Sequence, residues 1–350
     1  MALTQVDQGL LSSTAQYTGF KNRIINGDFK IAQRGTSFTS GSNSDDTYNL
    51  DRWYVLSDGN DIVDITQTTT VPTGAQNSIG LDVETINKKF GIAQIIEASN
   101  CYDAIGGNVT LSFQAKVSSL TKLDNVKCAI VAWSGTADTV TSDIISAWGV
   151  EGTNPTLIAN ATYENTPANL SVTTSFASYS VTANVDTAST KNIILFIWSD
   201  VTDTTLGDFL YITNVQLEKG STATSFDYRP YGTEYALCQR YCFTLISNGS
   251  NSSSFMGVWR PATTSMLVVI TFPVVMRSSP SGSVPAGSSS WGTMDGLNPY
   301  TGTPTLGAAS PYSITINIPT STPTFASGYG LMALMYANTG AVCLLATAEL

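Results

Sequence analysis

KNIILFIW, residues 191–198, is the stretch of sequence that decides the fold of this chain. After Lys191 and Asn192, six apolar residues follow without interruption, from Ile193 to Trp198. A half-exposed strand alternates apolar and polar side chains, whereas a short unbroken run of β-branched and aromatic residues is typical of a buried strand. The segment therefore predicts a strand that is covered on both of its faces.

Further strands are predicted on either side of this segment. Residues 111–117 (LSFQAKV) and 181–185 (VTANV) alternate apolar and polar side chains with a period of two, and residues 210–217 (LYITNVQL) read as another strand. Turn signals separate them, namely Gly106-Gly107-Asn108, Ser199-Asp200 and Gly207-Asp208. Many short strands at such spacing predict an all-β sandwich or barrel over residues 25–230.

The chain changes in character after this region. A linker helix is predicted over residues 231–243, YGTEYALCQRYCF, directly after Pro230. In residues 244–350 strands are predicted near 266–272, 313–318 and 330–336, and the charged side chains number four: Arg260, Arg277, Asp295 and Glu349. Exposed domains normally need more charge to stay soluble, so this smaller C-terminal β-domain is expected to serve oligomerisation and/or receptor binding. A monomer solvated by its Ser and Thr side chains is the alternative.

Composition excludes several classes of function. The chain has 350 residues, a formal net charge of -10 and no histidine. Without histidine there is no Ser-His-Asp or Cys-His catalysis and no His-ligated zinc. An acidic surface repels phosphate backbones, so no nucleic acid partner is expected. No apolar run is long enough for a membrane span, so no membrane insertion is expected.

The cysteines and the N-terminal residues point to structural roles. The five cysteines are odd in number and scattered, which favours buried free thiols over a disulfide framework. Residues 1–24 contain little apolar periodicity and no signal peptide, and they are interpreted as an N-terminal anchoring arm of a product made in a cytosol. A disordered terminus is the alternative.

Several blocks of the sequence resemble one family of proteins. They are YTGFKNRIINGDF (17–29), Gln33-Arg34-Gly35, LDRW (50–53), ITNVQLEKG (212–220), SFDYRPYGTEYALCQRYCF (225–243), FPVVMRSSP (272–280) and the final AEL. In this order they resemble the tail-fibre and head-fibre proteins of tailed bacteriophages. The resemblance implies a virion protein, a homotrimer, and a jelly-roll β-sandwich like a carbohydrate-binding module over residues 25–230.

A structural calcium ion is a further implication of the resemblance. Similar NGDF segments in carbohydrate-binding jelly rolls often supply a calcium ligand, and calcium prefers carboxylate and carbonyl oxygens. Asp28 and Glu218 are therefore candidate ligands for calcium. The alternative is that Asp28 caps a turn and Glu218 is an ordinary surface residue.

Aromatic side chains are the candidate ligand-binding groups, because sugars stack their apolar faces on Trp and Tyr rings. Four tryptophans lie near Ser- or Gly-rich turns and are expected to be exposed enough for glycan binding: Trp133, Trp148, Trp259 and Trp291. Core packing is the alternative for each. Trp53 and Trp198, in contrast, fit strand cores by their pattern.

These observations favour a non-enzymatic virion fibre that attaches to host surface polysaccharide, with other virion proteins as partners. A capsid decoration protein (head fibre) without host binding is the second hypothesis. A glycan hydrolase is the third, since such an enzyme needs two carboxyl groups. The clustered carboxylates lie in turn-like contexts where nothing is expected to raise one pKa selectively, so no catalytic residue is predicted: Asp58, Asp61, Asp64, Asp200, Asp203 and Asp208.

Overall fold

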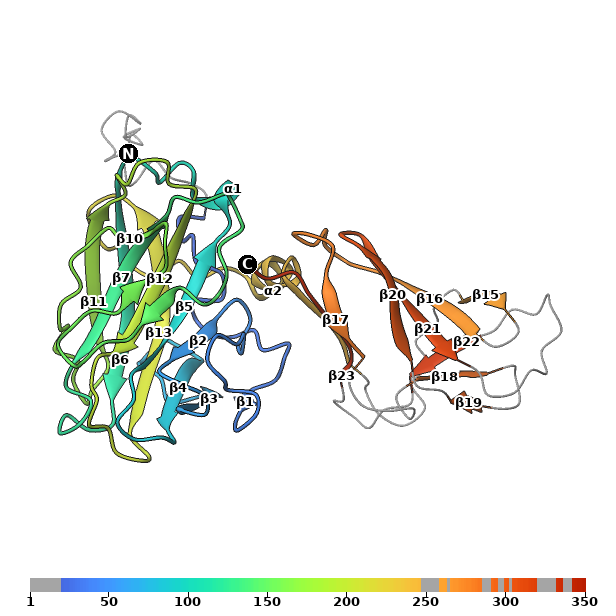
Figure 1. Ribbon diagram of the computed structural model, residues 1–350, viewed down its shortest axis with the longest axis horizontal. Coiled ribbons are helices and arrows are strands. Elements are labelled where there is room, and N and C mark those ends of the chain that lie inside the picture. The colour runs from blue at the N-terminus through green and yellow to red at the C-terminus, as the bar shows by residue number, and fades with distance from the viewer. Residues whose placement is uncertain are drawn as a thin grey trace, which may run out of the picture. The chain divides into compact units, whose positions relative to one another are not determined.

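The computed structural model describes residues 20–246, 258–262, 265–284, 291–294, 299–301, 304–319, 332–335 and 342–350. The chain separates into two compact units, which we call unit 1 (residues 1–231 with Leu350) and unit 2 (residues 232–349). β-strands dominate the described part of both units (Figure 1). Most of the predicted arm, residues 1–19, lies outside the described residues.

Unit 1 is a sandwich of two antiparallel sheets over its described residues. The six-stranded sheet follows the order β1 (Ser37–Phe38), β3 (Val63–Thr68), β4 (Ser78–Val83), β13 (Phe209–Lys219), β6 (Asn108–Val117) and β11 (Ala177–Asn184). The five-stranded sheet follows the order β10 (Ala161–Tyr163), β7 (Val126–Trp133), β12 (Asn192–Ser199), β5 (Phe90–Ile96) and β2 (Tyr54–Ser57). Because the chain crosses repeatedly from one sheet to the other, the sandwich is a jelly roll, as predicted.

The main core of unit 1 fills the space between these two sheets. Leu111, Ile212 and Leu217 reach it from the six-stranded sheet, and Ile193, Leu195 and Ile197 from β12 of the five-stranded sheet. The three β12 residues alternate along their strand, since successive strand side chains point to opposite faces. The strands predicted at 111–117, 193–198 and 210–217 are confirmed within β6, β12 and β13, and the strand predicted at 181–185 is the end of β11, which stops at Asn184.

A second core covers the other face of the five-stranded sheet. There Ile194, Phe196 and Trp198 of β12 pack against side chains of the long connection after β7, including Ile144 and Trp148. This connection contains the short pair β8 (Ile145–Ala147) and β9 (Thr156–Leu157). Every residue of β12 is therefore buried, which confirms the burial on both faces predicted from its apolar run.

Unit 2 begins with helix α2, which is shorter than predicted. It spans Tyr231–Gln239, and the last residues of the predicted helix instead belong to β14 (Cys242–Ile246). Cys242 pairs with Thr347 of β23 (Val342–Thr347), and the Tyr241 N–H donates to the Cys238 carbonyl in the turn between helix and strand. Pairing with a strand a hundred residues away thus overrides the local helical pattern. Such a distant pairing could not be predicted from local sequence.

The rest of unit 2, over its described residues, forms three small antiparallel sheets. The first has the order β14, β23 and β17 (Ser281–Ser283). The second has the order β15 (Val258–Ala262), β16 (Ser265–Thr271), β21 (Ser313–Pro319) and β20 (Thr305–Ser310). The third has the order β19 (Pro299–Thr301), β18 (Trp291–Met294) and β22 (Met332–Met335). Val268, Ile270, Ile316 and Leu344 contribute to the core. The strands predicted near 266–272, 313–318 and 330–336 are confirmed as β16, β21 and β22.

All five cysteines are buried, as expected for structural thiols. Burial raises the pKa of Cys101 to about 11, so its reactive thiolate form is suppressed. In the described part of the chain, neither α1 (Ala98–Cys101) nor α2 has the length and apolar character that crossing a membrane requires.

Candidate functional site

A groove of about 460 Å³ lies on the six-stranded sheet of unit 1. Its floor is made by polar side chains of two neighbouring strands, β6 and β11, which run side by side (Figure 1). Ser112 and Gln114 alternate with core residues of β6 and so point away from the core; they pair with Ser180 and Ser178. The complete lining is Thr73, Ser112, Phe113, Gln114, Ser178, Tyr179, Ser180, Asn214, Ala223, Thr224, Ser225, Phe226 and Tyr228.

A β-bulge in β13 aims an amide into this groove. The register between β13 and β6 shifts between Thr213 and Gln216, and Asn214 takes a left-handed backbone conformation with φ 52°. The Asn214 Nδ2 donates to Gln114 Oε1 at 2.8 Å, so two amide side chains meet at the groove floor. Val215, the next residue, turns into the core. Bulges often redirect side chains in this way.

The wall of the groove is the segment 221–230, which follows β13. The Glu218 carboxylate accepts hydrogen bonds from the Thr224 N–H at 2.8 Å and the Thr224 hydroxyl at 2.7 Å. Gln216 accepts from the Asp227 N–H at 2.8 Å, and Asp227 in turn accepts from the Lys21 N–H at 2.9 Å. These contacts tie the wall to β13 and to the chain's N-terminal segment.

The N-terminal segment is itself locked into the sandwich by buried asparagines. Asn22 donates to the Val215 carbonyl at 3.1 Å and accepts from the Ile24 and Leu217 N–H groups, so it replaces ladder bonds that the bulge interrupts. Asn26 donates to the Ile31 carbonyl at 2.9 Å and accepts from the Ile31 N–H. The motif NRIINGDF therefore supports the groove from behind without lining it.

Two aromatic rings form one side of the groove. Phe226 and Tyr228 make an edge-to-face pair with ring centroids 4.7 Å apart. Tyr228 is 53% exposed, and its hydroxyl donates to the Gly74 carbonyl at 3.1 Å, which fixes the ring. A fixed, exposed ring beside amide and hydroxyl groups suits a ligand that combines an apolar face with hydroxyls.

The groove is electrically neutral along its described lining, which contains no Asp, Glu, Lys or Arg. Tyr228 also borders a smaller depression of about 230 Å³, lined by Asp28, Lys30, Gly74 and Gln76 as well. There the Lys30 Nζ pairs with Asp28 Oδ2 at 3.1 Å. The groove therefore offers hydrogen bonds from neutral groups, with one ion pair beyond Tyr228.

The structure corrects the expected exposure of two tryptophans. Trp133 and Trp148 are buried, at 8% and 9% exposed, in the second core. The Trp133 Nε1 donates to the Thr136 carbonyl at 3.0 Å, and Trp148 packs edge-on to Phe196. Because the connection after β7 folds back over the sheet, neither ring is free to stack on a sugar. The side chains of Trp259 and Trp291 lie outside the described residues.

Asp28 and Glu218, the residues predicted to bind calcium, both have protein partners. Asp28 faces the ammonium group of Lys30, and both Glu218 oxygens accept hydrogen bonds from protein donors. Among the described residues no group of three or more acidic or cysteine side chains is placed to hold a metal ion. A cation bound by both carboxylates would compete with the Lys30 ammonium and with the Thr224 hydroxyl, and calcium binding by this pair stays a prediction.

The environment of the carboxylates also differs from expectation. Burial, with Glu84, Asp64 and Asp208 nearby, raises the pKa of Asp82 to about 6. Burial likewise raises the pKa of Asp64, which pairs directly with Asp82 across β3 and β4. The expectation that nothing raises a carboxyl pKa in these clusters is therefore wrong for Asp64. Neither residue lines the groove.

Among known proteins, the chain resembles several solved structures in fold. No family model matches the chain. No curated protein matches it either. The enzymatically active domain of tailspike protein 4 from bacteriophage CBA120 is similar with a TM-score of 0.35 and 18% identity, over 57% of this chain and 21% of that one.

Sugar-binding proteins are among the other similar structures. A putative sugar-binding protein from Bacteroides thetaiotaomicron has a TM-score of 0.35 and 15% identity, over 57% of this chain and all of that one (100%). The CBM22-1 xylan-binding domain of Paenibacillus barcinonensis Xyn10C has a TM-score of 0.30 and 11% identity, over 53% and 94%. TM-scores this low do not establish a shared function or ligand.

Sequence reasoning missed the groove residues themselves. Gln114 and Tyr228 stand in ordinary strand and loop contexts, and their meeting depends on pairing between strands a hundred residues apart in sequence. One signal was available, since the polar positions of LSFQAKV must face away from the core. The polar residues of an alternating strand mark the open face of a sheet, where a binding groove can form.

Proposed function

We propose that this chain is a structural fibre protein of a tailed-phage virion, and that unit 1 binds host surface glycans in its groove without catalysis. The observation that carries the glycan proposal is the neutral groove with the exposed, fixed ring of Tyr228 beside Gln114 and Asn214. The virion assignment rests on the sequence resemblance of the blocks at 17–29, 212–220 and 225–243.

The chemistry of the groove matches a neutral sugar. A pyranose ring presents C–H groups on its face, which pack on an aromatic ring, and hydroxyls at its edge, which both donate and accept. The amides of Gln114 and Asn214 can do the same, since each has a carbonyl oxygen and an NH₂ group. No carboxyl group lies in the described lining, so a two-carboxylate hydrolysis has no residues there.

Tyr228→Ala is expected to weaken glycan binding by about five- to tenfold, because a good aromatic contact contributes about 1 kcal/mol. Tyr228→Phe retains the ring and is expected to bind nearly as the parent does. The measurement is titration of the purified full chain with a polysaccharide selected on an array of bacterial surface glycans. Tyr102→Ala is the matched control, since Tyr102 is 73% exposed in unit 1 but does not line the groove.

Other outcomes would contradict parts of this proposal. Equal binding by the parent and Tyr228→Ala would remove the groove as the site. Binding to host cells that survives periodate oxidation of their glycans would indicate a protein receptor. Binding to fibre-less capsids, with none to any glycan, would favour the decoration protein. Release of reducing ends that Asp82→Asn abolishes would favour the hydrolase.

The proposed oligomer is a homotrimer, which would multiply weak glycan contacts through avidity. Unit 2 supports this in two ways: its low charge, and the outward Val269 of β16, which is 48% exposed beside buried Val268 and Ile270. Light scattering of the full chain at micromolar concentration is expected to give three times the 37.1 kDa of one chain. A monomer mass would refute the trimer and leave the groove proposal untouched.

A further inference from the structure

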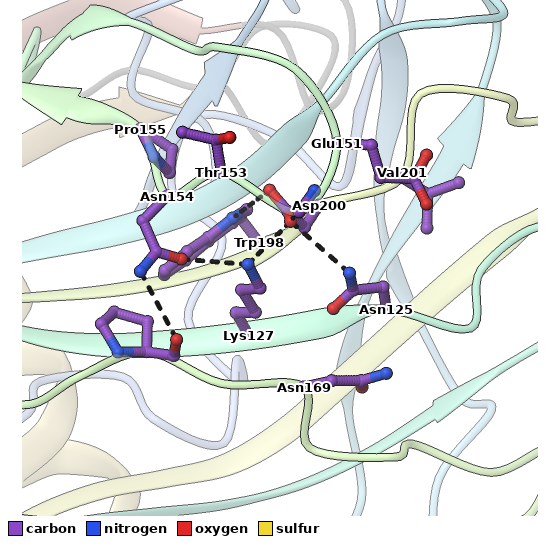
Figure 2. Close-up of polar contacts among 12 residues, drawn as sticks. Asn125, Lys127, Glu151, Thr153, Asn154, Pro155, Asn169, Trp198, Asp200 and Val201 are labelled. Atoms are coloured by element: carbon purple, nitrogen blue, oxygen red, sulfur yellow. Dashed lines mark hydrogen bonds and ion pairs between the residues drawn. The ribbon is translucent and has the colours of Figure 1, made fainter.

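Lys127, Asn154 and Asp200 meet beneath the connection that covers the second core of unit 1 (Figure 2). The Lys127 Nζ lies 3.0 Å from Asn154 Oδ1 and 2.7 Å from Asp200 Oδ2. An amide C=O bond is about 1.23 Å long, so the Asn154 Cγ lies within about 4.2 Å of the lysine nitrogen. An amine, an amide carbon and a carboxylate are thus in contact range of one another.

The amine and the carboxylate are buried, and Asn154 is half-buried. The Asp200 side chain is fully buried, and that of Lys127 is 7% exposed. Trp198 lies beside the carboxylate, with its Nε1 3.5 Å from Asp200 Oδ1, and its ring is stacked on Phe196 with centroids 4.4 Å apart. Proton transfer between the amine and the carboxylate is therefore shielded from bulk solvent.

A second lysine, Lys89, also pairs with Asp200, so the cluster holds two positive groups and one negative group. The Lys89 Nζ lies 2.5 Å from Asp200 Oδ1 and also donates to the carbonyls of Val150 and Thr153 at 2.8 and 3.0 Å. Two ammonium groups therefore share one buried carboxylate. Lys89 is held by backbone carbonyls in addition, whereas Lys127 has the Asn154 amide as its other partner. Of the two lysines, Lys127 is thus the one whose nitrogen contacts both the carboxylate and an amide carbonyl.

We propose that Lys127 and Asn154 join in an intramolecular isopeptide bond, with Asp200 as the group that transfers the proton. Asp200 takes a proton from the Lys127 ammonium, and the neutral Nζ attacks the Asn154 Cγ. The Nζ–Cγ bond forms, the Cγ–Nδ2 bond breaks, and the former amide nitrogen leaves as ammonia after receiving the second proton that the attacking Nζ loses. Asp200 returns to the carboxylate by giving its proton to the departing ammonia, so the net products are an amide and ammonium, without oxidation or reduction.

Asn154, and not Asp200, is the electrophile in this arrangement. Burial alone would raise the pKa of Asp200, but the hydrogen bonds and charges of Lys127 and Lys89 outweigh it and lower that pKa, which keeps the group a carboxylate. A carboxylate resists attack by an amine, whereas an amide carbonyl that accepts a hydrogen bond is polarised toward it. The Asn154 Nδ2 donates to the Pro167 carbonyl at 3.4 Å, which orients the amide plane (Figure 2).

The bond would link β7 covalently to the connection that covers the second core. This stabilising role is separate from glycan binding. The test is the intact mass of the purified full chain after denaturation. We expect a deficit of the mass of one ammonia relative to the sequence. Digestion with trypsin and Glu-C should yield a branched peptide that joins Lys127 to Asn154 and is not cut after Lys127.

Variants make the test specific. Lys127→Arg and Asn154→Ala should restore the full sequence mass, and Asn169→Ala, an exposed asparagine nearby, should keep the deficit. Asn154→Asp should also keep its full sequence mass, because a carboxylate resists attack by an amine. Full mass for the parent chain after prolonged incubation, with cleavage after Lys127, would overturn the proposal. So would a linkage mapped to Asp200. Near-ultraviolet circular dichroism of each variant confirms that it is folded.

Discussion

Asp200→Asn is expected to lower the free energy of unfolding of unit 1 by about 3–5 kcal/mol, because it removes the negative member of a buried ion network. Lys89 and Asp200 are both essentially inaccessible to solvent and lie 2.5 Å apart. With a neutral amide at position 200, at least the Lys89 ammonium stays buried without a counter-charge, whether or not Lys127 is joined to Asn154. Backbone carbonyls alone compensate for that charge incompletely.

Urea unfolding followed by tryptophan fluorescence measures this loss. Asp203→Asn is the matched control, since Asp203 lies in the same loop and pairs with Lys122 at 2.5 Å, but its side chain is 59% exposed. Exposed ion pairs contribute little, so little change is expected there. If Asp200→Asn were as stable as Asp203→Asn, the buried network would not be a stabilising element of the fold.

Gly27→Ala is expected to destabilise unit 1 by about 3 kcal/mol, because an added methyl group has no space. A Cβ at position 27 would lie 2.1 Å from the Val215 carbonyl oxygen. That oxygen cannot withdraw easily: it accepts a hydrogen bond from Asn22, and the Val215 N–H donates to the Gly27 carbonyl at 2.8 Å. The clash would therefore push on the bulge that carries Asn214.

Gly232→Ala provides the comparison, because a Cβ there meets nothing within 4 Å. Gly232 lies in α2, where alanine is favoured, so a gain of up to about 1 kcal/mol is expected. Denaturant unfolding of both variants checks the difference. Gly27→Ala should also weaken glycan binding, since it displaces the groove floor. Equal stability of the two variants would mean that the N-terminal segment tolerates movement away from β13.

Much of the fold followed from local pattern. The run from Ile193 to Trp198 predicted burial on both faces, and the alternation in residues 111–117 predicted a half-buried strand, because side-chain direction in a strand repeats every two residues. The same rule implied that Gln114 faces away from the core. The predicted helix was longer than α2 because Cys242 and Phe243 fit a helical pattern locally. Their strand partner, β23, lies about a hundred residues further along the chain.

The sequence by itself determined the all-β class, the two-part organisation, the lack of histidine chemistry and the position of the main strands, since composition and two-residue periodicity are local properties. The tertiary structure alone decided the groove, the burial of Trp133 and Trp148, and the meeting of Lys127, Asn154 and Asp200. Each of these depends on cross-strand register and on how a long connection folds over a sheet. Such contacts join residues far apart in sequence, and no local pattern specifies them.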